Sequence, residues 1–140
     1  MIGPTAEVTE ANSGVAFTAR VDTGAAVTSI HCTPDDVVIQ DPSEDPWGNV
    51  GKAIRLRIAN RGGQSSWVET RLIDYVEVRS ANGAEHRYRV RLPLRYGDVQ
   101  KQTIVNLNDR SQMTFRMLLG RDFLEGDFLV DVSRPTTPSF

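Results

Sequence analysis

The residues best placed to do chemistry form a short polar run, Asp22-Thr23-Gly24-Ala25, directly after an apolar segment. The run puts a carboxylate at the end of a predicted strand and follows it with a hydroxyl and with a residue that lacks a Cβ. A carboxylate positioned in this way can act as a general acid or base. The same residue types also form ordinary Asx turns, so the run alone leaves catalysis and a plain turn open.

A second signal lies near the C-terminus. The apolar run Met117-Leu118-Leu119 ends at Gly120 and is followed by Arg121-Asp122-Phe123-Leu124. Taken alone, this pattern predicts a buried strand that leads into a single helical turn. We interpret Asp122 as part of the turn after Gly120, and the sequence holds a single Asp-Thr-Gly run.

The composition limits the function classes. The chain has 140 residues, the size of one domain, and a net charge of −2, which does not indicate a nucleic-acid partner. Its middle, residues 52–95, holds ten basic and four acidic residues, which is weak evidence for an acidic partner. One cysteine and two histidines cannot build a disulfide framework or a closed Cys/His zinc site within one chain, so we expect no metal. No apolar run approaches the ~20 residues that span a bilayer, so we expect no membrane partner.

Strand patterns cover most of the chain. Alternating apolar residues and turn signals predict an all-β barrel or sandwich. The strongest turn signal is Asn82-Gly83, which lies between two β-rich segments and predicts a hairpin. Pro93 indicates an edge or the end of a strand. The predicted strands are 15–21, 27–30, 37–39, 54–58, 65–73, 75–79, 86–96, 99–107, 115–119 and 128–132.

The two motifs together resemble the retropepsins, the single-domain aspartic proteases. The resemblance implies a small, closed or partly open barrel with one short C-terminal helix. It implies that Asp22 is catalytic, supported by its loop and by a segment that passes beneath it, and that the predicted hairpin is a flap over the substrate. The loop support would be Thr23, Gly24, Ala25, Leu118, Leu119 and Gly120, and the flap would be Ala81, Asn82 and Gly83.

The resemblance narrows to the bacterial retropepsin-like group known as ATP-dependent zinc proteases. It rests on Ala19–Ala25, Thr28–His31, Arg79–Gly83, Leu107–Met113 and Leu118–Arg121. Neither ATP nor zinc has support in these residues, so we expect no cofactor. The predicted organisation is an N-terminal extension (1–14), a barrel (15–133) and a flexible tail (134–140), with the segment 128–132 at a dimer interface.

The chemistry implied for Asp22 requires two chains. Hydrolysis of a peptide by water needs one group to accept a proton and another to donate one, and two carboxyls that share a proton do both. Because the chain has one Asp-Thr-Gly, we expect a symmetric homodimer with both Asp22 side chains at its two-fold axis. The expected activity is that of an aspartic endopeptidase with a peptide or protein substrate.

Two departures from the retropepsin pattern stand out. Many retropepsins place an acid two residues after the catalytic glycine, where it pairs with the arginine after the second glycine. Here that position is Ala26, so Arg121 needs another partner, for example across a subunit interface. Extra sequence over residues 32–72 predicts an added hairpin that reshapes the cleft.

Other residues carry weaker interpretations. His31 is expected to be structural, and Cys32 has no evident base that would make it a nucleophile. Arg87, Arg89, Arg91 and Arg95 share one face of a predicted strand; if that face lines the cleft, the substrate is acidic. Some members of the resembling family are encoded beside glutamate ligases, which implies glutamate-rich tails as one candidate.

Two other functions remain open from the sequence. One is an inactive retropepsin-fold module that binds peptides or proteins. The other, less favoured, is a metal-dependent hydrolase that recruits His31 and Cys32 across a dimer. For the compartment, the cytoplasm is the default expectation, and a periplasmic location would need a signal or tether before Met1.

Overall fold

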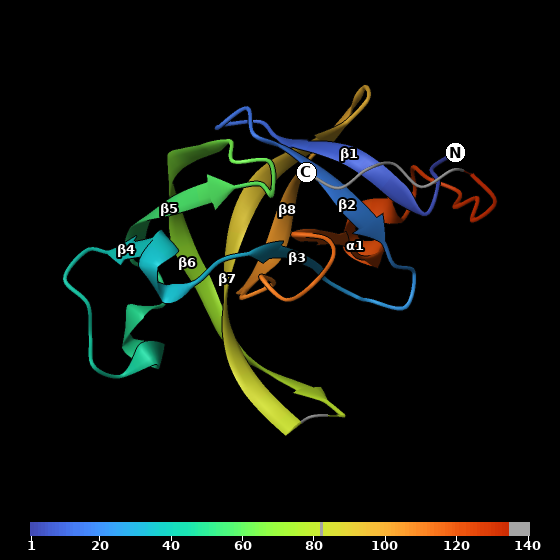
Figure 1. The fold of residues 1–140 in the computed structure, drawn as a ribbon. Coiled ribbons are helices and arrows are strands. Elements are labelled where there is room, and N and C mark those ends of the chain that lie inside the picture. Colours follow the sequence, from blue (N-terminus) through green and yellow to red (C-terminus); the bar gives the residue numbers. More distant parts are fainter. Residues whose placement is uncertain (82, 135–140) are drawn as a thin grey trace.

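Strands account for most of the chain in the computed structural model, which describes residues 1–81 and 83–134 (Figure 1). The predicted all-β fold with one short helix near the C-terminus is confirmed. In the described part of the chain, no helix is long and apolar enough to cross a membrane. The elements are β1 (Thr5–Glu10), β2 (Ala16–Val21), β3 (Thr28–His31), η1 (Pro34–Asp36), β4 (Val37–Ile39), η2 (Pro46–Asn49), β5 (Ala53–Ala59), β6 (Ser65–Ser80), β7 (Gly83–Tyr96), β8 (Val99–Asn108), β9 (Met117–Leu119) and α1 (Arg121–Leu124).

The strands form one sheet in the order β1-β2-β9-β3-β8-β7-β6-β5-β4, and β1 also pairs with β7. That extra pairing closes β1, β2, β9, β3, β8 and β7 into a ring, which we call the barrel ring. β9 lies between β2, to which it runs parallel, and β3, to which it runs antiparallel. Six strands that close on themselves form a barrel, and β6, β5 and β4 continue outside it. The predicted closed or partly open barrel is thereby confirmed.

The remaining strands extend from the barrel ring as a smaller sheet. We call β4, β5 and the first half of β6, residues 65–72, the branch (left in Figure 1). The predicted added hairpin is therefore present, as β5 and β6, with β4 as a third strand. Alternation positions its core: Ile54, Leu56 and Ile58 are buried, whereas Arg55 and Arg57 face outward.

β6 is one long strand, although the sequence predicts two. A register shift between Leu72 and Asp74 marks the point where β6 changes its partner from β5 to β7. Beyond that point β6 and β7 form the predicted hairpin, which projects from the barrel in Figure 1. Its last pair joins Ser80 to Gly83, whose φ of 113° suits a residue without a Cβ. Asn82 lies outside the described residues.

Pro93 lies within β7 and does not end it. β6 pairs with β7 as far as Val90, and β1 pairs with it from Leu94, so Pro93 occupies the gap between these two neighbours. A residue that has no amide hydrogen to donate fits there because neither strand needs one. Pro93 therefore marks a local edge inside a long strand.

The predicted N-terminal extension, residues 1–14, contributes a strand to the barrel ring. Within this segment Ile2, Ala6 and Val8 belong to the hydrophobic core. Glu10 is fully buried, and its carboxylate accepts a hydrogen bond from the Ser13 amide at 2.6 Å, which stabilises the turn between β1 and β2.

The predicted last strand, residues 128–132, is reduced to a single bridge between Val130 and Ile2. The carboxylate of Asp131 accepts hydrogen bonds from the amide and hydroxyl of Ser133, so the chain turns there and pairing stops. Leu129 remains 74% exposed. Residues 135–140 of the predicted tail lie outside the described residues.

Candidate active site

Asp22 begins a tight turn at the end of β2. Its backbone amide donates to the carbonyl of Leu119 at 3.0 Å, which ties the turn to β9. The Gly24 amide donates to the Asp22 carboxylate at 2.9 Å, and the Ala25 amide donates to the Asp22 carbonyl at 3.2 Å. Asp22 is half-buried, whereas Thr23 and Gly24 are exposed. The turn therefore holds one carboxylate in a fixed position at the surface of the barrel.

The Leu118-Leu119-Gly120 segment lies directly against this turn, where the sequence places it. Leu119 is fully buried and Leu118 is half-buried. A Cβ on Gly120 would lie 2.7–2.9 Å from backbone atoms of Val27, closer than such atoms approach in proteins. Glycine is required here because two backbones cross, and this crossing fixes the Asp22 turn.

A polar relay beside the crossing was not predicted. The Gly120 amide donates to the Thr28 hydroxyl at 3.1 Å, and that hydroxyl donates to the Asp122 carboxylate at 2.7 Å. Asp122 also accepts from the Thr28 amide at 3.1 Å. Asp122 thus joins the first residues of α1 to the start of β3. The sequence shows an Asp after Gly120, but nothing in the local pattern pairs it with a threonine so distant along the chain.

Arg121 finds its partners within its own chain. Its guanidinium donates to the Thr23 carbonyl at 3.0 Å, and its amide donates to the Ala25 carbonyl at 2.8 Å. These contacts lie within one chain, and the suggested partner across a subunit interface stays a prediction. A backbone carbonyl takes the place of the carboxylate that Ala26 cannot supply.

A cleft of about 430 Å³ lies between the hairpin of β6 and β7 and the end of the Asp22 turn, where Ala25 lines it and Asp22, Thr23 and Gly24 do not. The loop side of this cleft is formed by Ala25, Ala26 and Leu118. We call it the arginine cleft, because its other lining residues include Arg79, Arg87, Arg89 and Arg110. The tip residues Ala81 and Gly83 do not line it, and the middle of the hairpin faces the turn instead.

The arginines of this cleft differ in their partners. Arg79 and Arg87 pair with Glu77 and Glu85 on their own strands. Among the residues that the structure describes, Arg89 and Arg110 form no ion pair, and Arg89 donates to the side-chain oxygen of Asn106 at 2.7 Å. The net charge of the lining is therefore positive.

Arg110 is the most deeply placed of these arginines, with only 6% of its surface exposed. Burial, with repulsion from Arg87 and Arg20, lowers its pKa from the usual value. A buried cation without a paired anion favours an anionic ligand, because the ligand would offset both burial and repulsion.

The structure places His31 and Cys32 away from the Asp22 turn. His31 Nδ1 accepts from the Arg110 amide at 2.9 Å, and burial lowers its pKa, so the ring is a neutral hydrogen-bond acceptor. Burial raises the pKa of Cys32 to about 12, which disfavours the thiolate. Within residues 1–81 and 83–134, no three His, Cys, Asp or Glu side chains are grouped to hold a metal.

The fold and the site together define a class. A ring of strands in which an Asp-Thr-Gly turn is crossed by a Leu-Leu-Gly segment is the arrangement implied for a retropepsin. The profile of the RimB-like family, described as the retropepsin-like aspartic endopeptidase RimB, matches residues 1–139. The chain therefore belongs to the RimB-like family, and the predicted retropepsin-like resemblance is confirmed.

Solved and curated relatives extend this result. A protein of unknown function from Legionella pneumophila has the same fold, with a TM-score of 0.76 and 22% identity over 97% of this chain and 95% of that chain. Proteins named probable alpha-L-glutamate ligase match at 31% identity over 84% of this chain in Shewanella pealeana and at 32% over 83% in Parasynechococcus marenigrum. The chain spans about a quarter of the length of these curated relatives.

Proposed function

We propose that this protein is an aspartic endopeptidase that works as a homodimer, with one Asp22 carboxylate from each subunit. The observation that carries the proposal is the Asp22 turn, in which a single half-buried carboxylate is fixed by the Gly24 amide and by β9 beside an open cleft. The close crossing of Gly120 and Val27 beneath the turn supports the proposal, because it holds the carboxylate in one position.

Two copies of this turn would give the chemistry that one lacks. Like charges a few ångströms apart cannot both ionise, so the pair would hold one proton between them. The ionised member would take a proton from water while the protonated member donates one to the substrate carbonyl. The exposed Thr23 hydroxyl is available to bind the partner's turn and to hold the carboxylates together against their repulsion. The hairpin would close over the bound peptide.

We further propose that the substrate is an acidic polypeptide. Arg89 and Arg110 have no paired anion, and both line the cleft beside the Asp22 turn. Of the four arginines that share the predicted face, Arg87 and Arg89 line the cleft, whereas Arg91 lines a separate hollow. The name alpha-L-glutamate ligase, given to relatives that share this domain, supports a substrate that contains glutamate.

Two alternatives make different predictions. An inactive peptide-binding module would bind acidic peptides without cleaving them, and its binding would not require dimers. A metal-dependent hydrolase would lose activity in the presence of a chelator. A cleavage assay with acidic peptides separates the binding module from the proposed protease, and the same assay with a chelator separates the metal-dependent hydrolase.

The test compares Asp22→Asn with Asp98→Asn, a matched variant in the turn between β7 and β8. We expect Asp22→Asn to reduce peptide cleavage by about a thousandfold, in the range of lost general acid–base catalysis, without changing the melting temperature. Asp98→Asn should cleave normally. The activity should survive EDTA, and sedimentation should show that the active species is a dimer.

A pH profile adds a second criterion. The rate should depend strongly on pH between about 4 and 8, because only the singly protonated pair is competent. A flat profile, or full activity in Asp22→Asn, would rule out the proposed mechanism.

A further inference from the structure

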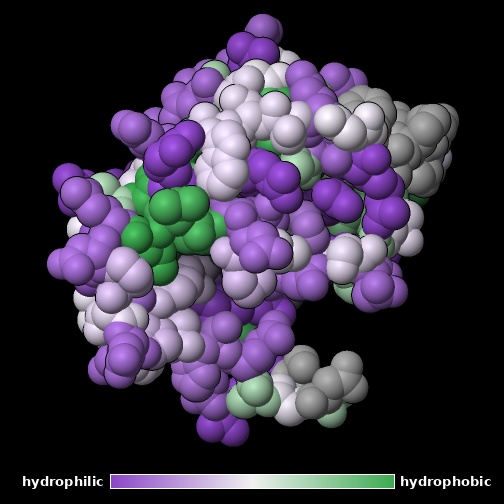
Figure 2. All heavy atoms as spheres, turned by 60° about the vertical axis from the view of Figure 1, so that its left-hand side comes forward, coloured by the Kyte–Doolittle hydropathy of each residue, from purple (hydrophilic) through white to green (hydrophobic). Residues whose placement is uncertain are grey.

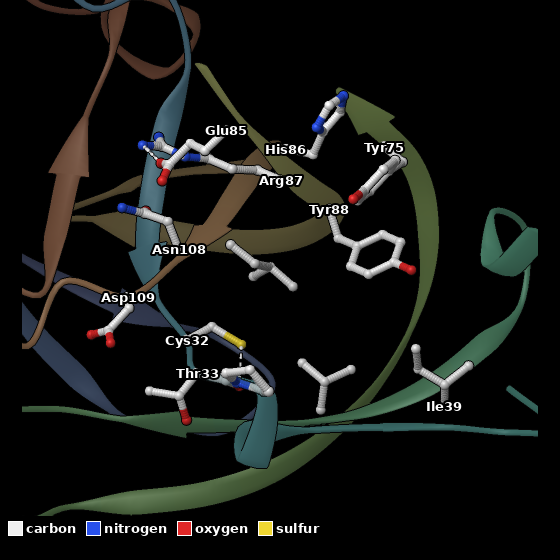
Figure 3. A pocket seen from close by; sticks show the side chains of 13 residues that line it. Cys32, Thr33, Ile39, Tyr75, Glu85, His86, Arg87, Tyr88, Asn108 and Asp109 are labelled. Carbon is white, nitrogen blue, oxygen red and sulfur yellow. Dashed lines mark hydrogen bonds and ion pairs between the residues drawn. The ribbon is translucent and has the colours of Figure 1, made fainter. Parts of the chain in front are cut away.

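A second hollow of about 400 Å³ lies outside the proposed catalytic machinery (Figure 3). We call it the apolar pocket. Its lining is mostly apolar and comes from segments far apart in the sequence: the chain between β3 and β4, β4 itself, the β6–β7 hairpin, and the end of β8. The residues that define it are Cys32, Val37, Ile39, Tyr75, Tyr88 and Leu107.

The walls of this pocket are braced from outside. The Tyr88 hydroxyl donates to the Pro46 carbonyl at 3.0 Å and accepts from the Asn49 side chain at 3.1 Å. Trp47 packs edge-on against Tyr75, with ring centroids 5.0 Å apart. These contacts fix η2 against the hairpin and satisfy the Tyr88 hydroxyl. The tyrosine rings therefore present apolar surface to a preformed cavity.

The hydrophobic character extends to the surface of the branch. Val38 is 50% exposed, and Val37 and Ile39 on either side of it are partly buried. Figure 2, which brings the left-hand side of Figure 1 forward, shows one compact hydrophobic cluster on a largely hydrophilic face.

The apolar pocket and the arginine cleft are joined where two strands separate. β7 and β8 pair as far as Arg89 and Asn106, and the strands diverge beyond that pair. A hollow of about 320 Å³ fills this fork. This hollow shares Arg110 with the arginine cleft and Asn108 with the apolar pocket. Arg87 lines all three hollows, which are therefore neighbours.

The fork also offers an unused hydrogen-bond acceptor. The side-chain oxygen of Asn108 is buried, and it has no hydrogen-bond partner in the described structure. Buried polar atoms in proteins are normally paired, and Asn108 lines both the fork and the apolar pocket, so its side chain is a candidate partner for a ligand that donates. The backbone amide of an extended peptide supplies such a donor along its whole length.

We propose that the apolar pocket is a remote subsite that receives an apolar or aromatic side chain of the polypeptide whose acidic residues lie in the arginine cleft. The peptide backbone would pass through the fork and donate to Asn108. This inference rests on the proposed function for the identity of the occupant. It makes the protein selective for acidic chains that carry a hydrophobic anchor at a fixed distance from the cleaved bond.

The first experiment measures peptide binding to the Asp22→Asn protein, which would not consume its ligand. Fluorescein-labelled acidic peptides carry one phenylalanine, moved one residue at a time away from the acidic run, and a phenylalanine-free peptide is the reference. We expect one narrow range of spacings to lower Kd about tenfold, the gain from burying one large apolar side chain. Cleavage by the wild-type protein should show the same gain in KM with kcat unchanged.

Two variants on β4 locate the effect. Val37 lines the apolar pocket, and Val38 faces the opposite side of the strand, where it lines a different hollow. Val37→Trp should fill the pocket and abolish the tenfold gain. Val38→Trp should leave the gain intact, and melting temperatures show whether both variants fold. An equal loss in both variants would overturn the inference.

A second measurement decides the case in which the peptides bind poorly. N-acetylphenylalaninamide is titrated into the protein, and methyl NMR signals of Val37, Ile39 and Leu107 should shift while those of Val38 do not. If neither this probe nor any peptide moves these signals, the pocket is not a subsite. A probe that binds without any gain from the peptides also overturns the inference, because the pocket then serves another ligand.

The outcomes also separate this inference from the proposed function. Cleavage that depends on Asp22 without any anchor effect would reject the subsite alone. An anchor effect that Val37→Trp removes, in a protein that cleaves no peptide, would reject the protease and keep the subsite.

Discussion

The barrel ring and the branch contribute to the proposed site in different ways. The ring holds Asp22 through backbone contacts, namely the hydrogen bond to Leu119 and the crossing of Gly120 over Val27. The hairpin contributes side chains, among them Arg87 and Arg89 in the arginine cleft and Tyr75 and Tyr88 in the apolar pocket, and the branch adds Val37 and Ile39 to that pocket. The crossing at Gly120 tolerates almost no other residue, whereas a lining of side chains can be altered one residue at a time. Under the proposed function, the ring would set the chemistry, and the hairpin and branch would set the selectivity.

The strongest test of this difference is Gly120→Ala in the ring. The added methyl would overlap backbone atoms of Val27, so we expect a loss of about 3 kcal/mol in the free energy of unfolding, measured by urea denaturation. Gly126→Ala is the matched control. Gly126 has a φ of 85° but open space around its Cβ position, so it should lose only about 1 kcal/mol. Equal losses would mean that the crossing is not a tight contact.

A smaller effect is expected at the relay beside the crossing. Thr28→Val removes the hydroxyl that joins the Gly120 amide to Asp122, and it leaves the buried Gly120 amide without its acceptor, whereas Asp122 keeps the backbone amide of residue 28 as a donor. We expect it to lower the free energy of unfolding by about 2 kcal/mol. Thr28→Ser keeps the hydroxyl and should stay much closer to the wild type. If valine and serine behave alike, the hydroxyl contributes nothing.

On the recognition side, Arg89→Gln should change selectivity without changing stability. Loss of one charge in a partly open cleft should raise KM for acidic peptides about fivefold, equivalent to about 1 kcal/mol, and leave neutral peptides unaffected. Arg91→Gln is the control, because Arg91 shares the face of β7 but lines another hollow. An equal rise in KM for Arg91→Gln would indicate a general electrostatic attraction to the basic surface instead of a specific contact with Arg89.

The smallest expected effect is a pH-dependent change in stability at Asp36, which lies next to the branch. Burial raises the pKa of Asp36, but hydrogen bonds from Thr33 and Arg57 outweigh it and leave the pKa below its usual value. A lowered folded-state pKa stabilises the protein above the unfolded value of about 3.9, and this contribution is lost as pH falls through the folded pKa. Asp36→Asn should therefore be less stable than the wild type at pH 7. The difference should shrink in acid, which thermal melts across pH can follow.

The sequence predicts the site residues of the barrel ring better than those of the hairpin and the branch. Asp22 and Gly120 could be identified because a carboxylate turn and a backbone crossing each demand a particular residue type. The partner of Arg121 could not be predicted, because it is a backbone carbonyl that any residue would offer. The apolar pocket is made of ordinary residues that are assembled by topology, so no local pattern marks it.

The same reasoning explains the errors in the fold. β1 escapes detection because its buried positions include Glu10, a residue that normally indicates the surface. β6 is predicted as two strands because the register shift after Leu72 interrupts the alternation. Both features depend on partners that lie far away in the sequence.

Closure of the barrel also has a kinetic consequence. The ring is completed only when Thr9 meets Arg95 and when Ala19 meets Met117, pairs that are separated by most of the polypeptide. A nascent chain on the ribosome would therefore display open β-edges until β9 emerges. Because such long-range pairing slows folding, this domain should fold slowly for its size, and a protected native state can form only after β9 has been synthesised.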